Sequence, residues 1–242
     1  MQALPVRPAR HGPLADPHRS SSRLTDVVLG GQDGVVNVLG MVLGVVAATG
    51  SARVVLVAGL AAGLSNSVSM AAVAYTSTRA AGDLFRSERA REYRHIEATP
   101  QLERDEIRDI YGRKGFGGEL LERIVETITS HKDVWVAIMM MEEHHLTDVD
   151  RTKSFRSAAI VGASALVGSL LPLSPFLMLP VASAAWSAVA LAAAALFALG
   201  VYKAKVTVGH PVKSGLELAA IGIASALIGY AVGALLRAPV AL

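Results

Sequence analysis

The sequence contains no cysteine and few aromatic residues, and both absences narrow the possible functions. Without thiols the chain cannot form a disulfide bond, a thiolate zinc site or a cysteine nucleophile, so any bound metal must use oxygen, nitrogen or thioether donors. Aromatic residues make up 5% of the chain, and no basic stripe alternates with them. The net charge of +3 therefore gives no reason to expect a nucleic-acid partner.

The chain also lacks the polar balance of an ordinary soluble domain, because 52% of its 242 residues are hydrophobic. Its apolar segments predict an all-α integral membrane protein with five transmembrane helices. A helix of about 20 residues crosses a hydrocarbon core of roughly 30 Å. The predicted spans cover about residues 26–50, 54–78, 157–171, 176–202 and 214–236.

Basic residues favour one orientation of these spans. They cluster before the first span, between the second and third, and between the last two, whereas the opposite loops carry Arg53 alone. With five spans all three clusters lie on one side, which the positive-inside rule assigns to the cytoplasm. We therefore expect residues 1–23 to form a disordered basic tail in the cytoplasm, and the C-terminus to lie outside.

A charged insert, residues 80–154, separates the spans of residues 24–79 from those of residues 155–242. The wider stretch 79–156 holds all but four of the 20 acidic residues, the exceptions being Asp16, Asp26, Asp33 and Glu217. Apolar residues recur in it every three or four positions, which is typical of amphipathic helices. We expect these helices at about residues 100–111, 118–130 and 133–146, on the cytoplasmic side.

Polar residues inside the first two spans indicate a path through the membrane. Asp33 lies in a glycine-rich part of span one, with Asn37 one turn later, and Asn66 and Met70 lie four residues apart in span two. An acid at membrane depth costs several kcal/mol and usually serves a function. The alternatives are that Asp33 caps a helix near the interface and that Met70 only packs.

Donors at helical spacing make the insert the stronger metal-site prediction. Glu92 and His95 lie three residues apart, as do Glu103 and Glu106, so each pair shares a helix face. Met139 and Met140 come one turn before Glu143, which puts thioethers beside a carboxylate. The alternative is a solvated face in which interleaved arginines pair with these acids. His131, His144 and His210 are expected to be structural or on the surface.

Together these segments resemble the vacuolar iron transporter family from about Arg23 to the C-terminus. The resemblance rests on Asp33-Gly34, Ser69-Met70-Ala71, the Glu103/Glu106 helix ending in Ile110-Tyr111 before Lys114-Gly115, and Met139-Met140-Met141-Glu142-Glu143. It implies a dimeric five-span exchanger that moves Fe²⁺, often also Mn²⁺, out of the cytosol for protons. By motif, the collecting ligands would be Glu92, Glu103, Glu106, Met139, Met140 and Glu143, with Asp33 and Met70 in the pathway.

The chain departs from the family pattern at several positions. His95 stands where a glutamate is common in the family, and Ser20-Ser21-Ser22 replaces an acid before the first span. Before Tyr75 in span two the chain has Val73-Ala74, where many family members have Gly-Glu or Gly-Gly. An imidazole binds metal only when neutral. These changes bear on the proton route and on the choice of metal, and they leave the predicted fold unchanged.

The sequence thus predicts a transporter that is not an enzyme and has no prosthetic group, with Fe²⁺ or Mn²⁺ as the bound and transported ion. Its expected partners are the lipid bilayer, a second copy and protons. An alanine- and arginine-rich composition indicates a bacterial plasma membrane. The alternatives are a membrane-anchored ferritin-like di-iron oxidase, built from Glu92-x-x-His95 and Glu142-x-x-His145, and a membrane scaffold that binds a partner protein.

Overall fold

Helices account for nearly all of the described structure. The computed structural model describes residues 21–147, 151–207 and 209–236, and these contain eight α-helices, one 3-10 turn and no strand. The prediction of an all-α fold is therefore confirmed for this part of the chain. Most of the predicted basic tail, residues 1–20, lies outside the described residues.

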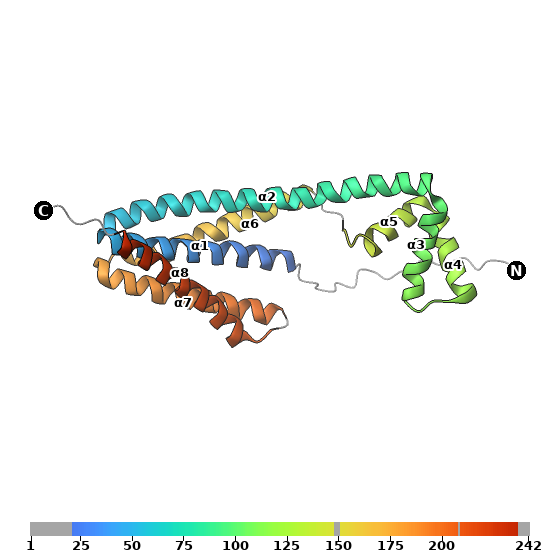
Figure 1. Cartoon of the computed structure of the whole chain (residues 1–242). Helices are drawn as coiled ribbons and strands as arrows, with labels where there is room; N and C mark the ends of the chain where they lie inside the picture. Colours follow the sequence, from blue (N-terminus) through green and yellow to red (C-terminus); the bar gives the residue numbers. More distant parts are fainter. Residues whose placement is uncertain (1–20, 148–150, 208, 237–242) are drawn as a thin grey trace, which may run out of the picture.

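The helices gather at the two ends of an elongated molecule (Figure 1). Five long helices lie side by side in a bundle, and three short ones sit beside the far end of α2. The bundle consists of α1 (Ser21–Thr49), α2 (Ala52–Ala98), α6 (Arg151–Leu170), α7 (Val181–Val206) and α8 (Pro211–Leu235). The short helices are α3 (Pro100–Arg113), α4 (Gly118–Thr129) and α5 (Lys132–Glu142), and the 3-10 turn Ser174–Leu177 joins α6 to α7.

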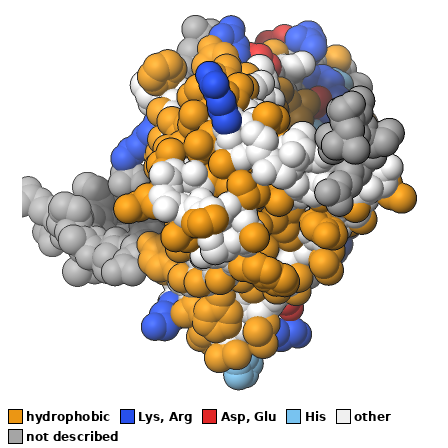
Figure 2. All heavy atoms as spheres, turned by 90° about the vertical axis from the view of Figure 1, so that its left-hand side faces the viewer, with side chains coloured by type: hydrophobic (Ala, Val, Ile, Leu, Met, Phe, Trp, Pro, Cys, Tyr) orange, Lys and Arg blue, Asp and Glu red, His pale blue; other side chains and the backbone are white. Residues whose placement is uncertain are grey.

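Four helices in the described residues, α1, α2, α7 and α8, are long and apolar enough to cross a membrane. The third predicted span, residues 157–171, corresponds to α6, which does not reach that apolarity because Arg151, Lys153 and Arg156 fall within its 20 residues. Figure 2 views the bundle end opposite the short helices and shows a surface made largely of hydrophobic side chains. Large hydrophobic side chains are also exposed along the bundle helices, such as Val57, Trp186 and Leu227, and such a surface implies a lipid bilayer around the bundle.

Small residues let α1 contact its neighbours backbone to backbone. A Cβ atom added at Gly34 would lie 2.1 Å from the carbonyl oxygen of Ala165 on α6, and one added at Gly229 on α8 would lie 1.8 Å from that of Gly40. Glycines four residues apart permit this close approach in membrane proteins. The first half of α1 is thus fixed to α6, and its second half to α8.

The second helix is continuous over 47 residues, so it carries the chain from the bundle into the insert. At about 1.5 Å per residue it is roughly 70 Å long. It ends at Ala98, where Pro100 occupies the first turn of α3 and fixes the change of direction. The insert then closes around one apolar core of Ile96, Ile107, Val125, Ile128, Trp135, Val136, Met139 and Met140.

The observed insert helices follow the sequence pattern except at the end of α5. Helices α3 and α4 agree with the predicted 100–111 and 118–130 to within two residues. Helix α5 ends at Glu142, so the prediction that it reaches Leu146 was wrong. The chain reverses here because His145 adopts a positive φ of 53°, and the Leu146 N–H donates to the Met140 carbonyl at 3.0 Å.

Replacing Gly229 by alanine is expected to destabilise the bundle, because the new Cβ would collide with the Gly40 carbonyl. Overpacking of this kind costs about 1–3 kcal/mol. The measurement is the thermal unfolding midpoint in detergent, which should fall. Gly31→Ala is the matched control, since its Cβ would meet only Leu199 Cδ2, at 3.7 Å. Equal midpoints in the two variants would contradict the backbone contact.

Candidate metal site

Three segments bring acidic side chains together in the insert: the far end of α2, helix α3 and the residues that follow α5. On α3, Glu103 and Ile107 lie one turn apart and both are buried. The face that packs α3 into the insert core therefore also carries Glu103 inward. Glu92 is buried on α2 one turn before the core residue Ile96, so core packing positions this carboxylate as well.

Glu92 and Glu103 are buried carboxylates with unused acceptor capacity. Each residue is 2% exposed. One oxygen of each, Oε2, has no hydrogen-bond partner within the described part of the chain. Because a buried carboxylate without full pairing costs several kcal/mol, such groups in proteins pair with cations or coordinate metals. These two side chains thus provide an incomplete site for a cation.

Two histidines approach these carboxylates. His144 Nε2 lies 3.0 Å from Glu92 Oε1, and His95 Nδ1 lies 3.5 Å from Glu103 Oε1. Glu92 belongs to two groups of three donors, one with Glu143 and His144 and one with His95 and Glu103. Within each group the donor atoms all lie within 4.8 Å of one another. Each group is close enough for its donors to converge on one divalent ion.

Burial and the closeness of several acids raise the pKa values of Glu103 and Glu106. Burial, and then the nearby charges of Glu106, Glu92 and Glu143, raise the pKa of Glu103 to about 7. Burial and the charge of Glu143 also raise the pKa of Glu106. A metal cation would offset this repulsion, and its binding would release the proton from Glu103 wherever that carboxyl is protonated.

The structure places the predicted thioether donors in the apolar core of the insert. Met139 and Met140 are 0% and 2% exposed and pack within that core. Their sulfur atoms as metal ligands stay a prediction. The backbone of Met139 has a clear role, because its carbonyl accepts hydrogen bonds from the N–H groups of Glu143 at 3.0 Å and His144 at 3.3 Å. It thereby fixes both donors that follow α5.

Sequence reasoning missed His144, which was expected to be structural or on the surface. The run Glu142-Glu143-His144-His145 predicts Glu142 with His145 as a pair only in the oxidase alternative, by the spacing Glu-x-x-His. These two side chains share a helix face only if the helix continues to His145. Because the helix ends at Glu142, His144 faces Glu92, and the Glu142 carboxylate instead pairs with Lys114 at 2.5 Å.

The polar residues of the membrane helices form a second cluster. Asp33 accepts hydrogen bonds from Asn37 Nδ2 at 2.9 Å and from Asn66 Nδ2, on α2, at 2.7 Å. The two asparagines line an open hollow of about 380 Å³ together with Val38, Ala62, Ser65 and Ser69. Three of the four predicted pathway residues thus come together. Met70 is partly buried and does not line the hollow.

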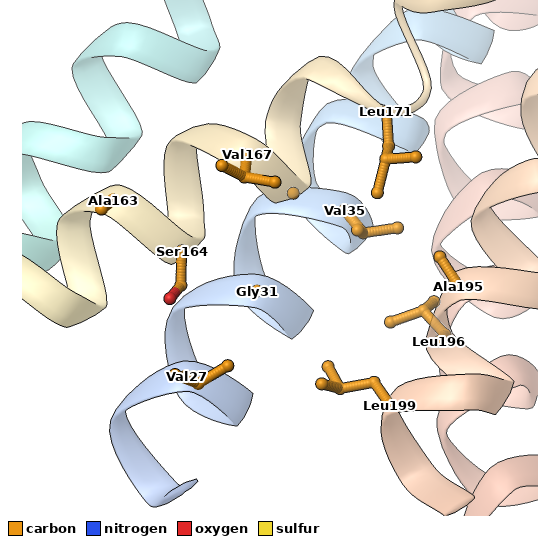
Figure 3. Close-up of a pocket in the computed structure, with 11 residues that line it drawn as sticks. Val27, Gly31, Val35, Ala163, Ser164, Val167, Leu171, Ala195, Leu196 and Leu199 are labelled. Atoms are coloured by element: carbon orange, nitrogen blue, oxygen red, sulfur yellow. The ribbon is translucent and has the colours of Figure 1, made fainter. Parts of the chain in front are cut away.

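A second hollow of about 320 Å³ lies between α1, α6 and α7 and has a different character (Figure 3). Apolar side chains such as Val27, Val35 and Leu199 point into it, and Ser164 supplies its only polar side chain. This lining offers no carboxylate or imidazole to a metal ion. In this respect it differs from the side of α1 that carries the Asp33 carboxylate.

Fold and site together define an all-helical membrane protein with an acid-rich helical insert able to hold divalent cations. The chain belongs to the VIT family, whose model matches residues 24–234. It is 30% identical to vacuolar iron transporter 2 of Oryza sativa subsp. japonica, over 81% of this chain and 80% of the relative. It is 31% identical to the vacuolar iron transporter of Toxoplasma gondii, over 90% and 76%. The resemblance found in the sequence is confirmed.

Replacing Glu103 by glutamine is expected to stabilise the metal-free protein at pH 8. An acid whose pKa is raised to about 7 in the folded state makes unfolding easier as pH rises from about 4.5 to 7. Glutamine removes this dependence, so the midpoints at pH 6 and pH 8, measured in EDTA, should move closer together. The exposed Glu126→Gln is the control. A gap between the two midpoints as large as the parent's would contradict the raised pKa.

Proposed function

We propose that this chain is a membrane transporter that carries Fe²⁺ or Mn²⁺ out of the cytosol in exchange for protons. The observation that carries the proposal is the pair of buried carboxylates, Glu92 and Glu103, each with an oxygen that has no partner among the described residues. Both lie within reach of an imidazole. The relatives named vacuolar iron transporters support iron as the cargo.

The proposed topology has five spans, with α6 as the third. Helix α6 packs against both α1 and α2, and its residues Val161, Ala165 and Ser169 are buried. Its basic residues lie within its first six positions, and the uncharged remainder of α6, residues 157–170, leads into the uncharged turn Ser174–Leu177. An odd number of spans leaves the N-terminus and the insert in the cytoplasm with the basic clusters, and the C-terminus outside.

The proposed route through the membrane begins at Asp33. Its carboxylate can replace part of a metal's hydration shell, while Asn37 and Asn66 hold it in place. Met70 follows Asn66 by one turn and offers a soft donor further along α2. Polar groups beside an open hollow are costly against lipid, so we propose that a second copy of the chain covers this face as a homodimer.

The proposed proton exchange draws on the acids of the insert. With its pKa near 7, Glu103 is partly protonated in a neutral cytosol, and metal binding displaces that proton.

The membrane in which the transporter lies is a further part of the proposal. Composition favours a bacterial plasma membrane, whereas the relatives carry the vacuole in their names. We propose that the transporter lies in the plasma membrane.

Asp33→Asn is expected to abolish metal flux while leaving metal binding by the insert intact, because the amide cannot supply the anionic ligand at membrane depth. The measurement is uptake of Fe²⁺ or Mn²⁺ into proteoliposomes under reducing conditions, with internal pH followed by a trapped dye. Glu217→Gln, which removes an exposed acid on α8, is the control. Undiminished flux in Asp33→Asn would remove Asp33 from the route.

Replacing both Glu103 and Glu106 by alanine is expected to weaken capture without blocking the membrane route. The metal concentration for half-maximal flux should rise by about tenfold or more, because two ligands are lost. Flux at saturating metal should stay close to that of the parent. If the double variant binds metal as tightly as the parent, the insert is not the collecting site.

One observation favours a second function, an iron oxidase. Four glutamates and two histidines are the ligands of ferritin-like di-iron sites, and the insert holds that set around Glu92. Against it, α3, α4 and α5 span only 14, 12 and 11 residues, shorter than the helices of such bundles usually are. Oxygen consumption on adding Fe²⁺, with no metal flux, would establish the oxidase instead of the transporter.

A further inference from the structure

Two imidazoles distinguish the metal site of the insert from a site made of carboxylates alone. We infer that His144 and His95 are nitrogen ligands of this site and make it prefer Fe²⁺ and later divalent metals to Mn²⁺. The inference rests on the proposed function, because it concerns the same capture site. It adds the donor chemistry that selects the cargo.

His144 is held in position by its surroundings. Its side chain is 15% exposed, and its Nε2 lies 3.0 Å from Glu92 Oε1. Its backbone N–H donates to the Met139 carbonyl, and the positive φ of His145 turns the chain directly after it. The ring therefore faces Glu92 because of the way α5 ends. A donor fixed in this way loses little conformational freedom when a metal binds.

His95 belongs to the second group of donors that includes Glu92. It lies three residues after Glu92 on α2, and its Nδ1 is 3.5 Å from Glu103 Oε1. Its side chain is 49% exposed, so it is held less firmly than His144. The two rings give each group of donors around Glu92 the same composition, two carboxylates and one imidazole. Nitrogen is thus available wherever an ion lies beside Glu92.

Nitrogen donors change selectivity in a known direction. Affinity for divalent metals rises from Mn²⁺ through Fe²⁺ and Co²⁺ to Ni²⁺, and imidazole suits these later metals, whereas carboxylate oxygens suit Mg²⁺, Ca²⁺ and Mn²⁺. Without the imidazoles the site would consist of Glu92, Glu103, Glu106 and Glu143, all hard oxygen donors. The two histidines therefore shift the preference away from Mn²⁺.

The opposing interpretation is that His144 serves only to pair with Glu92 in the metal-free protein. In that case its replacement would weaken or strengthen all metals to a similar extent. A ligand role changes the ratio between metals and leaves a nitrogen signal on the bound ion. These two readouts separate coordination from a structural role, because pairing with Glu92 alone would move neither of them.

The test uses the full chain, purified in detergent, with Co²⁺ as an air-stable stand-in for Fe²⁺ and Mn²⁺ as the competitor. His144→Glu replaces nitrogen by oxygen at the same place and is expected to lower the Co²⁺ to Mn²⁺ affinity ratio about tenfold. His95→Glu should lower it in the same direction. The matched control is His131→Gln, which removes an exposed imidazole whose Nδ1 lies 2.8 Å from Ser130 Oγ. It should leave the affinity ratio unchanged.

A spectroscopic readout guards against loss of folding in His144→Glu. Pulsed electron paramagnetic resonance of bound Mn²⁺ should show coupling to ¹⁴N in the parent and none in the double variant His95→Gln, His144→Gln. Bound Mn²⁺ without such coupling in the parent, or an unchanged affinity ratio in folded His144→Glu, would overturn the inference and leave the transporter proposal standing. If the parent protein shows the nitrogen coupling but transports neither Fe²⁺ nor Mn²⁺ into proteoliposomes, the transporter proposal alone is overturned.

Discussion

Contact between helix backbones along α1 is the constraint on which the rest of the structure depends. Glycines bring α1 against α6 in its first half and against α8 in its second half. Asp33 lies next to Gly34, at the tightest part of the contact with α6. Because the helix is fixed there, the carboxylate meets Asn66 of α2 at hydrogen-bond distance without a flexible segment between them.

The insert is organised by a different principle, the burial of charge beside an apolar core. Packing of Ile107 and Ile96 into that core brings Glu103 and Glu92 inward, and the end of α5 then directs His144 at Glu92. The burial of these acids costs free energy, which a bound cation would offset. The raised pKa of Glu103 is one sign of that cost.

The sequence alone indicates much of this architecture, and the exceptions have physical causes. Long apolar runs and the break at Pro100 locate the helix ends to within about six residues, except that α2 continues to Ala98, well past the predicted end of its span at residue 78. Hydropathy does not establish α6 as a span, because basic residues share the helix with its apolar part. The role of His144 depends on a positive φ at His145 and on a partner 52 residues away, and neither is visible in a periodic pattern. Spacing placed Met139 and Met140 near the carboxylates without showing that both are buried in the apolar core.

The continuous helix α2 connects the polar cluster around Asp33 to the acidic cluster around Glu92 as one rigid element. Asn66 and Glu92 lie on the same helix, separated by about 40 Å at a rise of about 1.5 Å per residue. A tilt of α2 by about 5° at the level of Asn66 would displace Glu92 by roughly 3 Å, and it would carry the insert along because α3 and α5 pack against α2. A small change in the inclination of α2 would therefore move the whole donor cluster relative to the bundle while leaving its donors together.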